Sequence, residues 1–224
     1  MFQRNKIAMI MAEFLGTAVL TEVVLTVSKS NIGIPYFVSL AAGLAVAALA
    51  LAFGAISGAH LNPAITIGLW SARRVQTLPA LVYVAAQLLG GICAYLLFTY
   101  LLNNQWPSTG HYEGRVLVAE AVGAFVFSMG WAAVVYQKIE GGRAAFLVGA
   151  ALTLGLLVAS AGAGAGGAVL NPAVALGARM WVWGTYVLGP VLGAIIGFNL
   201  YALLFASDNS LIERVRAAKN RAKK

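Results

Sequence analysis

Two copies of one tripeptide hold the residues with the clearest chemical potential, Asn62-Pro63-Ala64 and Asn171-Pro172-Ala173. Asparagine is a favoured N-cap and proline is favoured at the first helical position, so each tripeptide predicts a helix start. The apolar run after each copy is short and ends at an arginine. About ten helical residues rise roughly 15 Å, half of a hydrocarbon core about 30 Å thick. We therefore expect half-helices over 62–72 and 171–180 that stop near the middle of a membrane.

Two such starts that meet from opposite sides would direct two positive helix ends at one point. Each end carries roughly half an elementary charge, so cations and protons would be repelled there. Short hydrophobic segments, interrupted by glycine or proline at matching positions of two halves, also indicate a site at the midplane of a membrane. The chemistry expected of the tripeptides is therefore the passage or binding of an uncharged molecule.

The composition favours a membrane around these elements. The 224 residues are 61% hydrophobic and only 10% charged, with a mean hydropathy of +0.85, which a soluble core could not accommodate. The formal charge of +8 does not indicate nucleic-acid binding, because the basic residues lie at segment ends and form no interleaved face. The sequence therefore predicts an integral multi-pass membrane protein that does not bind nucleic acid.

The fold expected is an all-α membrane protein with six transmembrane helices and two re-entrant half-helices in an inverted repeat. The six spans are predicted at about 7–28, 34–54, 79–102, 115–136, 144–161 and 184–206. With both termini cytoplasmic, only Lys29, Arg115 and Arg179 of the 15 basic residues lie outside, as the positive-inside rule favours. We expect the chain to sit in the plasma (inner) membrane and to contact lipid.

The two halves of the chain repeat. Ala12–Thr17 opens the first span and Ala119–Ala124 opens the fourth, 107 residues later, while the two tripeptides lie 109 residues apart. Tyr83–Gly90 and Tyr186–Gly193 match near the third and sixth spans. Because each half has three spans, the second copy must run upside down. We expect one domain over 1–224, with repeats over about 1–104 and 112–207 and a basic cytoplasmic tail over 208–224.

With these motifs the chain resembles the aquaporins, the major intrinsic protein family. The resemblance covers nearly the whole chain and is carried by Ala12–Thr17, Ser57–Ala64, Gln87, Asn171–Ala173 and Gly189-Pro190. It implies a homotetramer in which each protomer has its own pore for water or small neutral solutes, without a cofactor. It also implies that the amides of Asn62 and Asn171 donate hydrogen bonds to permeants at the pore midplane, beside Pro63, Ala64, Pro172 and Ala173.

The resemblance also implies that Glu13 and Glu120 hold the two re-entrant loops, and we group His60 with these loop-anchoring residues. His60 is either a hydrogen-bonded loop residue near the inner mouth or a pH gate. No metal site is expected, since the other histidine, His111, belongs to the opposite loop. The glycine run over 162–167 contains G-x-G-x-x-G, but its place between a span and a half-helix favours a loop lining the outer pore.

The sequence departs from the family pattern at the outer filter. Most aquaporins carry an arginine three residues after the second motif asparagine, where this chain has Val174. Arg179 lies five residues further along, about 7 Å up a helix, too far to replace it. Counting places Ala42, Leu156 and Ala168 at the other filter positions. An apolar filter of this kind would be wider and less selective, or Val174 would form a tight hydrophobic gate that slows water.

The predicted function is a passive channel for water and small uncharged solutes, including glycerol-like polyols and ammonia, with cations and protons excluded at the paired tripeptides. Two alternatives are an ion- or proton-coupled secondary transporter and a closed-pore structural membrane protein. An enzyme is not expected, because no nucleophile–base pair or metal cluster is present in the sequence. Glu22 lies nine residues after Glu13, on the opposite face of the first helix, where a neighbouring subunit or lipid is expected.

Overall fold

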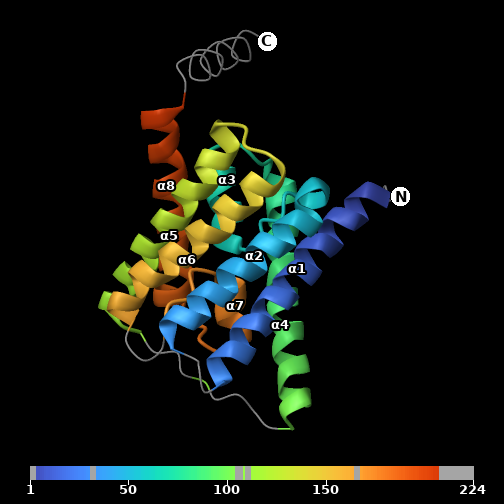
Figure 1. Ribbon diagram of the computed structural model, residues 1–224, viewed down its shortest axis with the longest axis vertical. Helices are drawn as coiled ribbons and strands as arrows, with labels where there is room; N and C mark the ends of the chain where they lie inside the picture. The colour runs from blue at the N-terminus through green and yellow to red at the C-terminus, as the bar shows by residue number, and fades with distance from the viewer. Residues whose placement is uncertain (1–3, 31–33, 104–107, 109–111, 164–166, 207–224) are drawn as a thin grey trace.

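The computed structural model describes residues 4–30, 34–103, 108, 112–163 and 167–206, and its regular elements are all helices (Figure 1). Five helices are long and continuous: α1 (Arg4–Lys29), α2 (Pro35–Ser57), α4 (Thr77–Leu102), α5 (Gly114–Tyr136) and α6 (Gly141–Ala163). The π-helix η2 (Trp183–Leu188) runs into α8 (Gly189–Phe205) to make a sixth long segment. The two short helices are α3 (Pro63–Ser71) and α7 (Pro172–Gly177).

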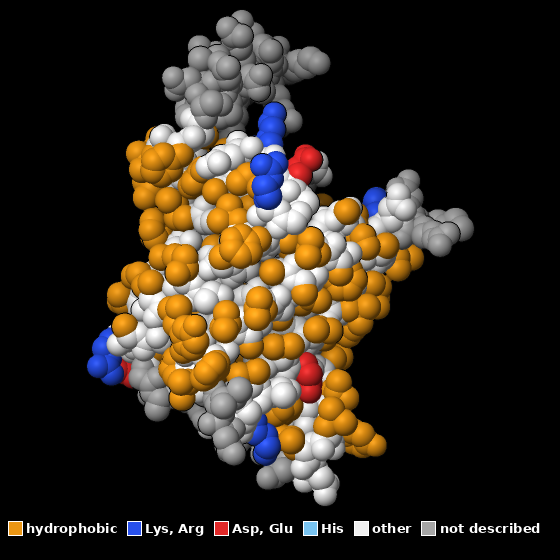
Figure 2. Space-filling model, viewed as in Figure 1, with side chains coloured by type: hydrophobic (Ala, Val, Ile, Leu, Met, Phe, Trp, Pro, Cys, Tyr) orange, Lys and Arg blue, Asp and Glu red, His pale blue; other side chains and the backbone are white. Residues whose placement is uncertain are grey.

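The long segments expose many apolar side chains on the outer surface of the protein. Six of them, including the combined Trp183–Phe205, are long and apolar enough to cross a membrane. Figure 2 shows a broad hydrophobic surface with lysines and arginines gathered toward its two ends. Large side chains such as Leu44, Leu81 and Phe146 are exposed on this surface because its solvent is lipid. The chain is an integral multi-pass membrane protein, and the prediction of six spans with two short helices is confirmed.

The span boundaries differ from the predicted ones by a few residues. The fifth span was expected over 144–161, but α6 extends from Gly141 to Ala163. Gly162 and Ala163, expected in an extended loop, are therefore helical, and Gly167 follows with a φ of +73°. The residues between them, 164–166, lie outside the described part of the chain.

The inverted repeat is visible in the packing of the long helices. α1 packs against α4 in the first half as α5 packs against α8 in the second, and α2 packs against α6 across the halves. The two intra-half contacts use matching glycines: Gly90 lies against the carbonyl oxygen of Phe14, and Gly193 lies against that of Ala121. Since the neighbour is backbone in both cases, neither position has room for a Cβ atom.

The two short helices lock the halves together. α3, from the first half, packs against α8, and α7, from the second half, packs against α4. Each short helix therefore rests on the last span of the opposite half. This exchange brings the N-terminal ends of α3 and α7 toward each other inside the molecule, where Asn62 and Asn171 each reach the loop before the other short helix.

Both short helices end with the same turn. Arg73 and Arg179 adopt left-handed backbone conformations, with φ of +58° and +56°. The next amide in each case closes the turn: Arg74 N donates to Leu69 O and Met180 N donates to Ala175 O, both at 2.8 Å. This pattern, an i to i−5 hydrogen bond over a left-handed residue, is the Schellman termination of a helix.

The prediction of a second half-helix over 171–180 is therefore wrong in length, because α7 ends at Gly177. Arg179 does not stand further up a helix; it lies in the turn that follows one. The same residue pair stands at both turns, Ala72-Arg73 after α3 and Ala178-Arg179 after α7.

The sixth span, predicted as continuous over 184–206, begins with the π-helical turn η2. Pro190 lies at the start of the regular helix that follows. Because proline has no amide proton and its ring clashes with the preceding turn, the wider turn accommodates it without interrupting the span.

We predict that Gly193→Ala destabilises the protein and that Gly54→Ala does not. A Cβ at position 193 would overlap the Ala121 carbonyl, whereas a Cβ at position 54 meets no atom within 4 Å. Overpacking typically costs about 1–3 kcal/mol, and alanine in an open helical position is favourable by about 1 kcal/mol over glycine. Thermal unfolding of both variants in detergent, followed by circular dichroism, measures the difference. Equal melting temperatures for the two variants would contradict the tight α5–α8 contact.

Candidate functional site

Each motif asparagine caps its own short helix. Asn62 has extended backbone and its Oδ1 accepts a hydrogen bond from Ala64 N at 2.8 Å. Asn171 Oδ1 accepts from Ala173 N at 3.0 Å and from Val174 N at 3.4 Å. Pro63 and Pro172 are the first residues of α3 and α7, as the motif predicts. The asparagine side chains thereby provide hydrogen-bond acceptors for backbone N–H groups at the buried starts of both helices.

The same two side chains also cross to the opposite loop. Asn62 Nδ2 donates to Leu170 O at 2.8 Å, and Asn171 Nδ2 donates to Leu61 O at 2.9 Å. Leu61 and Leu170 hold φ of +51° and +55°, the left-handed region that a leucine rarely adopts. Such a conformation costs on the order of 1–3 kcal/mol, which the surrounding contacts offset. Each amide has two N–H bonds, so one remains after this crossing contact.

A buried carboxylate organises the loop before α3. Ser57 Oγ and His60 N donate to Glu13 Oε1 at 2.7 and 3.0 Å. Leu61 N and Gln87 Nε2 donate to Glu13 Oε2 at 2.8 and 2.7 Å. The carboxylate on α1 thus receives four hydrogen bonds, two of them from backbone amides of the loop that carries Asn62.

Glu120 occupies the matching place on α5 with fewer partners. Val169 N and Leu170 N each donate to its carboxylate at 2.7 Å. The position that corresponds to Gln87 is Pro190, which has no side-chain donor. Both carboxylates are fully buried, but only the first is joined to a polar side chain of the third span in its half.

His60 lies beside the first loop and is hydrogen-bonded through one ring nitrogen. Its Nδ1 is 3.2 Å from Thr66 Oγ1. Its ring meets those of Tyr83 and Trp131 edge to face, at centroid distances of 5.3 and 5.8 Å. The imidazole is therefore held between the loop before α3 and two aromatic side chains, beside the crossed asparagines.

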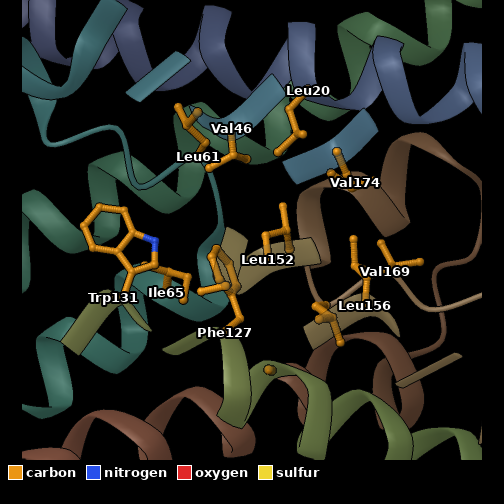
Figure 3. Packing of buried hydrophobic residues seen from close by; sticks show 14 of the residues in the cluster. Leu20, Val46, Leu61, Ile65, Phe127, Trp131, Leu152, Leu156, Val169 and Val174 are labelled. Atoms are coloured by element: carbon orange, nitrogen blue, oxygen red, sulfur yellow. The ribbon is translucent and has the colours of Figure 1, made fainter. Parts of the chain in front are cut away.

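A narrow cavity of about 20 Å³ runs beside the crossed asparagines. This volume admits roughly one water molecule. The polar side chains on its wall are His60, Asn62 and Asn171, and the rest of the wall is apolar. Figure 3 shows the apolar side chains that surround it, with Leu61, Val46, Phe127 and Leu152 toward one end and Leu156, Val169 and Val174 toward the other.

The predicted site residues divide into two sets around this cavity. Its wall includes the four predicted filter residues together with His60 and the two asparagines: Ala42, Leu156, Ala168, Val174, His60, Asn62 and Asn171. Pro63, Ala64, Pro172, Ala173, Glu13 and Glu120 are buried but are not on the wall.

Arg179 is directed away from the cavity. Its Nη1 is 3.5 Å from Tyr95 Oη on α4, and its guanidinium carbon lies 5.7 Å from the centre of the Tyr95 ring. Its carbonyl oxygen accepts a hydrogen bond from Ser108 Oγ. The left-handed turn after α7 directs the Arg179 side chain to Tyr95 on α4.

Sequence reasoning missed several residues of the cavity wall, among them Val46, Phe127 and Leu152. The spacing along α2 could have indicated Val46, which lies one helical turn from the predicted filter residue Ala42. This indication is weak, because many other apolar side chains of the spans have the same spacing.

We predict that Glu13→Ala destabilises the protein more than Glu120→Ala. The first substitution leaves four buried donors without their acceptor and the second leaves two. Each buried donor left unpaired costs about 1–3 kcal/mol. Thermal unfolding in detergent measures both, with Glu13→Gln as the variant that keeps shape and part of the hydrogen bonding. A larger loss for Glu120→Ala would contradict the unequal bonding of the two loops.

Comparison with known proteins identifies the family. Residues 2–201 match the family model described as "Major intrinsic protein". Aquaporin Z of Photorhabdus laumondii is 32% identical over 87% of this chain and 96% of its own length. Aquaporin NIP3-1 of Zea mays is 34% identical over 89% of this chain and 70% of its own. The solved structure of the aquaglyceroporin from Plasmodium falciparum shares the fold, with a TM-score of 0.69, 23% identity and coverage of 92% and 99% of the two chains. The chain therefore belongs to the major intrinsic protein family, the non-enzymatic channels of the aquaporin and aquaglyceroporin type.

Proposed function

We propose that this channel passively conducts water and small uncharged solutes, including glycerol-like polyols and ammonia, and excludes cations and protons at the paired Asn-Pro-Ala motifs. The observation that carries the proposal is the narrow cavity beside two helix starts that face each other. Among the described residues, its wall holds two asparagines and no Lys, Arg, Asp or Glu side chain. A neutral permeant can take a hydrogen bond from each asparagine amide as it passes.

Cation exclusion follows from the charge distribution at the crossing. Two helix N-termini contribute partial positive charge there, and no carboxylate lies on the cavity wall to offset it. An ion would also lose its hydration in a cavity that admits roughly one water molecule, and it would regain little from apolar side chains. Neutral molecules avoid both costs.

The outer filter supports broad selectivity among neutral molecules. Its proposed residues are small or apolar, namely Ala42, Leu156, Ala168 and Val174. Arg179, the nearest basic residue along the chain after Val174, contacts Tyr95 on α4. The filter would then lack the charged donor that orients water and restricts larger solutes. A polyol would need Leu156 or Val174 to change rotamer, so water should pass faster than glycerol.

We also infer a homotetramer in the plasma (inner) membrane with both termini cytoplasmic. Proteins of this family typically form tetramers. Glu22 supports a protein partner, since its side chain on α1 is partly exposed while its Oε2 is buried without a hydrogen-bond partner among the described residues. A carboxyl group facing lipid alone would be costly. The cross-packing of the short helices supports a single domain built from repeats over about 1–104 and 112–207.

Reconstitution into proteoliposomes tests the function directly. Stopped-flow light scattering should show water, glycerol and ammonia entering faster than in protein-free vesicles, with water fastest and no current of protons or sodium. Uptake against a gradient in the presence of a proton gradient would instead favour a coupled transporter. Intact tetramers with no permeability to any neutral solute would favour a closed-pore structural protein.

We predict that Val174→Arg lowers glycerol permeability at least about tenfold, the effect of roughly 1.4 kcal/mol of added barrier. The longer charged side chain would occupy the filter and offer donors that suit water better than a polyol. Val174→Leu adds apolar bulk without charge and serves as the matched control. Stopped-flow permeabilities of water and glycerol measure both variants. Unchanged permeabilities in both would contradict the place of Val174 in the outer filter.

We predict that Glu22→Gln weakens the oligomer. The neutral side chain would lose a charge-assisted contact with the neighbouring subunit, so less tetramer should survive mild heating in detergent. Size-exclusion chromatography with light scattering measures the fraction of tetramer. Glu140→Gln, at an exposed carboxyl group at the start of α6, is the control and should leave that fraction unchanged. The interface assignment is contradicted if the two variants behave alike.

A further inference from the structure

A second, wider cavity continues the narrow one toward the inner ends of α2, α5 and α6. Its volume is about 410 Å³. One face of α2 borders both cavities. Ala42 and Val46 on this face border the narrow cavity, and Ala50 and Gly54, the next residues at helical spacing, border the wide one. α6 repeats the pattern, with Leu152 on the narrow cavity and Val148 on the wide one. The two cavities therefore lie end to end along one path.

Trp131 on α5 lies where the wide cavity meets the narrow one. It borders the wide cavity, while Phe127, one turn away on the same helix, borders the narrow one. Its ring is 5.8 Å from that of His60, which also borders the narrow cavity. In Figure 3 the nitrogen-bearing edge of the Trp131 ring is turned toward Phe127. We call this junction of Trp131 and His60 the inner neck.

The indole N–H of Trp131 is buried without a hydrogen-bond acceptor. The side chain is only 6% exposed, and Nε1 has no partner among the described residues. A buried donor left unpaired is costly and uncommon, so it calls for a partner that is absent from the protein itself. A donor at the narrowing of a path for small molecules can find that partner in the permeant.

We assign the proton of His60 to Nδ1 from the bonding of Thr66. Thr66 Oγ1 has a single proton, and we place it in the hydrogen bond to Asn62 O at 3.0 Å or to Gln87 Oε1 at 3.4 Å. With either choice, the Nδ1 of His60, 3.2 Å from Thr66 Oγ1, is the donor of that pair. A neutral imidazole with its proton on Nδ1 has a lone pair on Nε2.

The accepting nitrogen of His60 lies toward the wide cavity. Gly58, on the wall of that cavity, has a φ of +90°, and a Cβ built on it would be 3.3 Å from His60 Nε2. Because the position is a left-handed glycine, no side chain covers the ring nitrogen there. The inner neck therefore offers a donor from α5 and an acceptor from the loop before α3.

We propose that Trp131 Nε1–H and His60 Nε2 form a donor–acceptor pair that binds the hydroxyl group of a permeating molecule at the inner neck. The proposal rests on the proposed function and adds an inner selectivity site to it. The fitting chemical class is a small neutral molecule with a group that both accepts and donates, which means water and polyols. Walls of Leu61 and Phe127 beyond the neck offer no replacement for lost hydration, so this pair lowers the barrier to entry.

Transport by three variants tests the role of the donor. Trp131→Phe removes the N–H and keeps an aromatic ring, and it should lower glycerol and water permeability roughly three- to tenfold, the worth of one hydrogen bond. Trp131→His returns an N–H on a smaller ring and should restore much of the loss. Trp70→Phe is the matched control, because Trp70 bonds to Thr77 outside the cavities and its substitution should change neither permeability.

A binding measurement separates this proposal from the proposed function. In protein labelled with ¹⁵N-tryptophan in nanodiscs, the indole resonance missing from Trp131→Phe is that of Trp131. Glycerol should shift this resonance in a saturable way and leave that of Trp70 in place, whether or not vesicles show transport. A resonance that does not respond to glycerol, or equal permeabilities of the Trp131→Phe and wild-type channels, would overturn the inner site. Wild-type vesicles that conduct nothing while the resonance responds would overturn only the proposed function.

Discussion

The reciprocal hydrogen bonds of Asn62 and Asn171 are the constraint on which the rest of the structure depends. In each asparagine, the side-chain oxygen accepts a hydrogen bond that caps its own helix, and the side-chain nitrogen donates one to the opposite loop. Both contacts are possible only if Leu61 and Leu170 turn their carbonyls across the junction, which requires left-handed backbone. The buried glutamates accept hydrogen bonds from the backbone amides of these leucines, and each short helix packs against the opposite half. All of these contacts hold the two loops where the asparagines can reach across.

Much of this arrangement could be predicted from the sequence because its signals are chemical and strong. Two Asn-Pro-Ala motifs, the apolar spans and the paired glutamates indicate the fold without coordinates. The end of α7 and the direction of Arg179 could not be predicted, because hydropathy does not reveal a left-handed turn at an arginine. Trp131 was not predicted for another reason: in a span this rich in apolar side chains, tertiary packing decides which of them borders a cavity.

The two halves repeat in backbone but differ in side-chain chemistry. Near the loop before α3, Glu13, Gln87, Thr66 and His60 form one connected hydrogen-bond network behind the cavity. Near the loop before α7, Glu120 receives two backbone amides among the described residues, and the nearby cavity wall is apolar. One end of the cavity therefore has polar groups close to it, and the other end is mostly hydrocarbon. This difference between the two ends is compatible with the repeated fold, because the hydrogen bonds of the two asparagines fix the backbone and the other side chains of the cavity wall can differ.

The exchange of short helices also has a consequence for biosynthesis. The partner of Leu61 O is the side chain of Asn171, 110 residues further along the chain, and α3 rests on the last span to be made. While the ribosome is still synthesising the second half, the first re-entrant segment lacks both the side-chain donor to Leu61 O and its supporting helix. The cavity beside the crossed asparagines is thus among the last parts of the described structure to assemble.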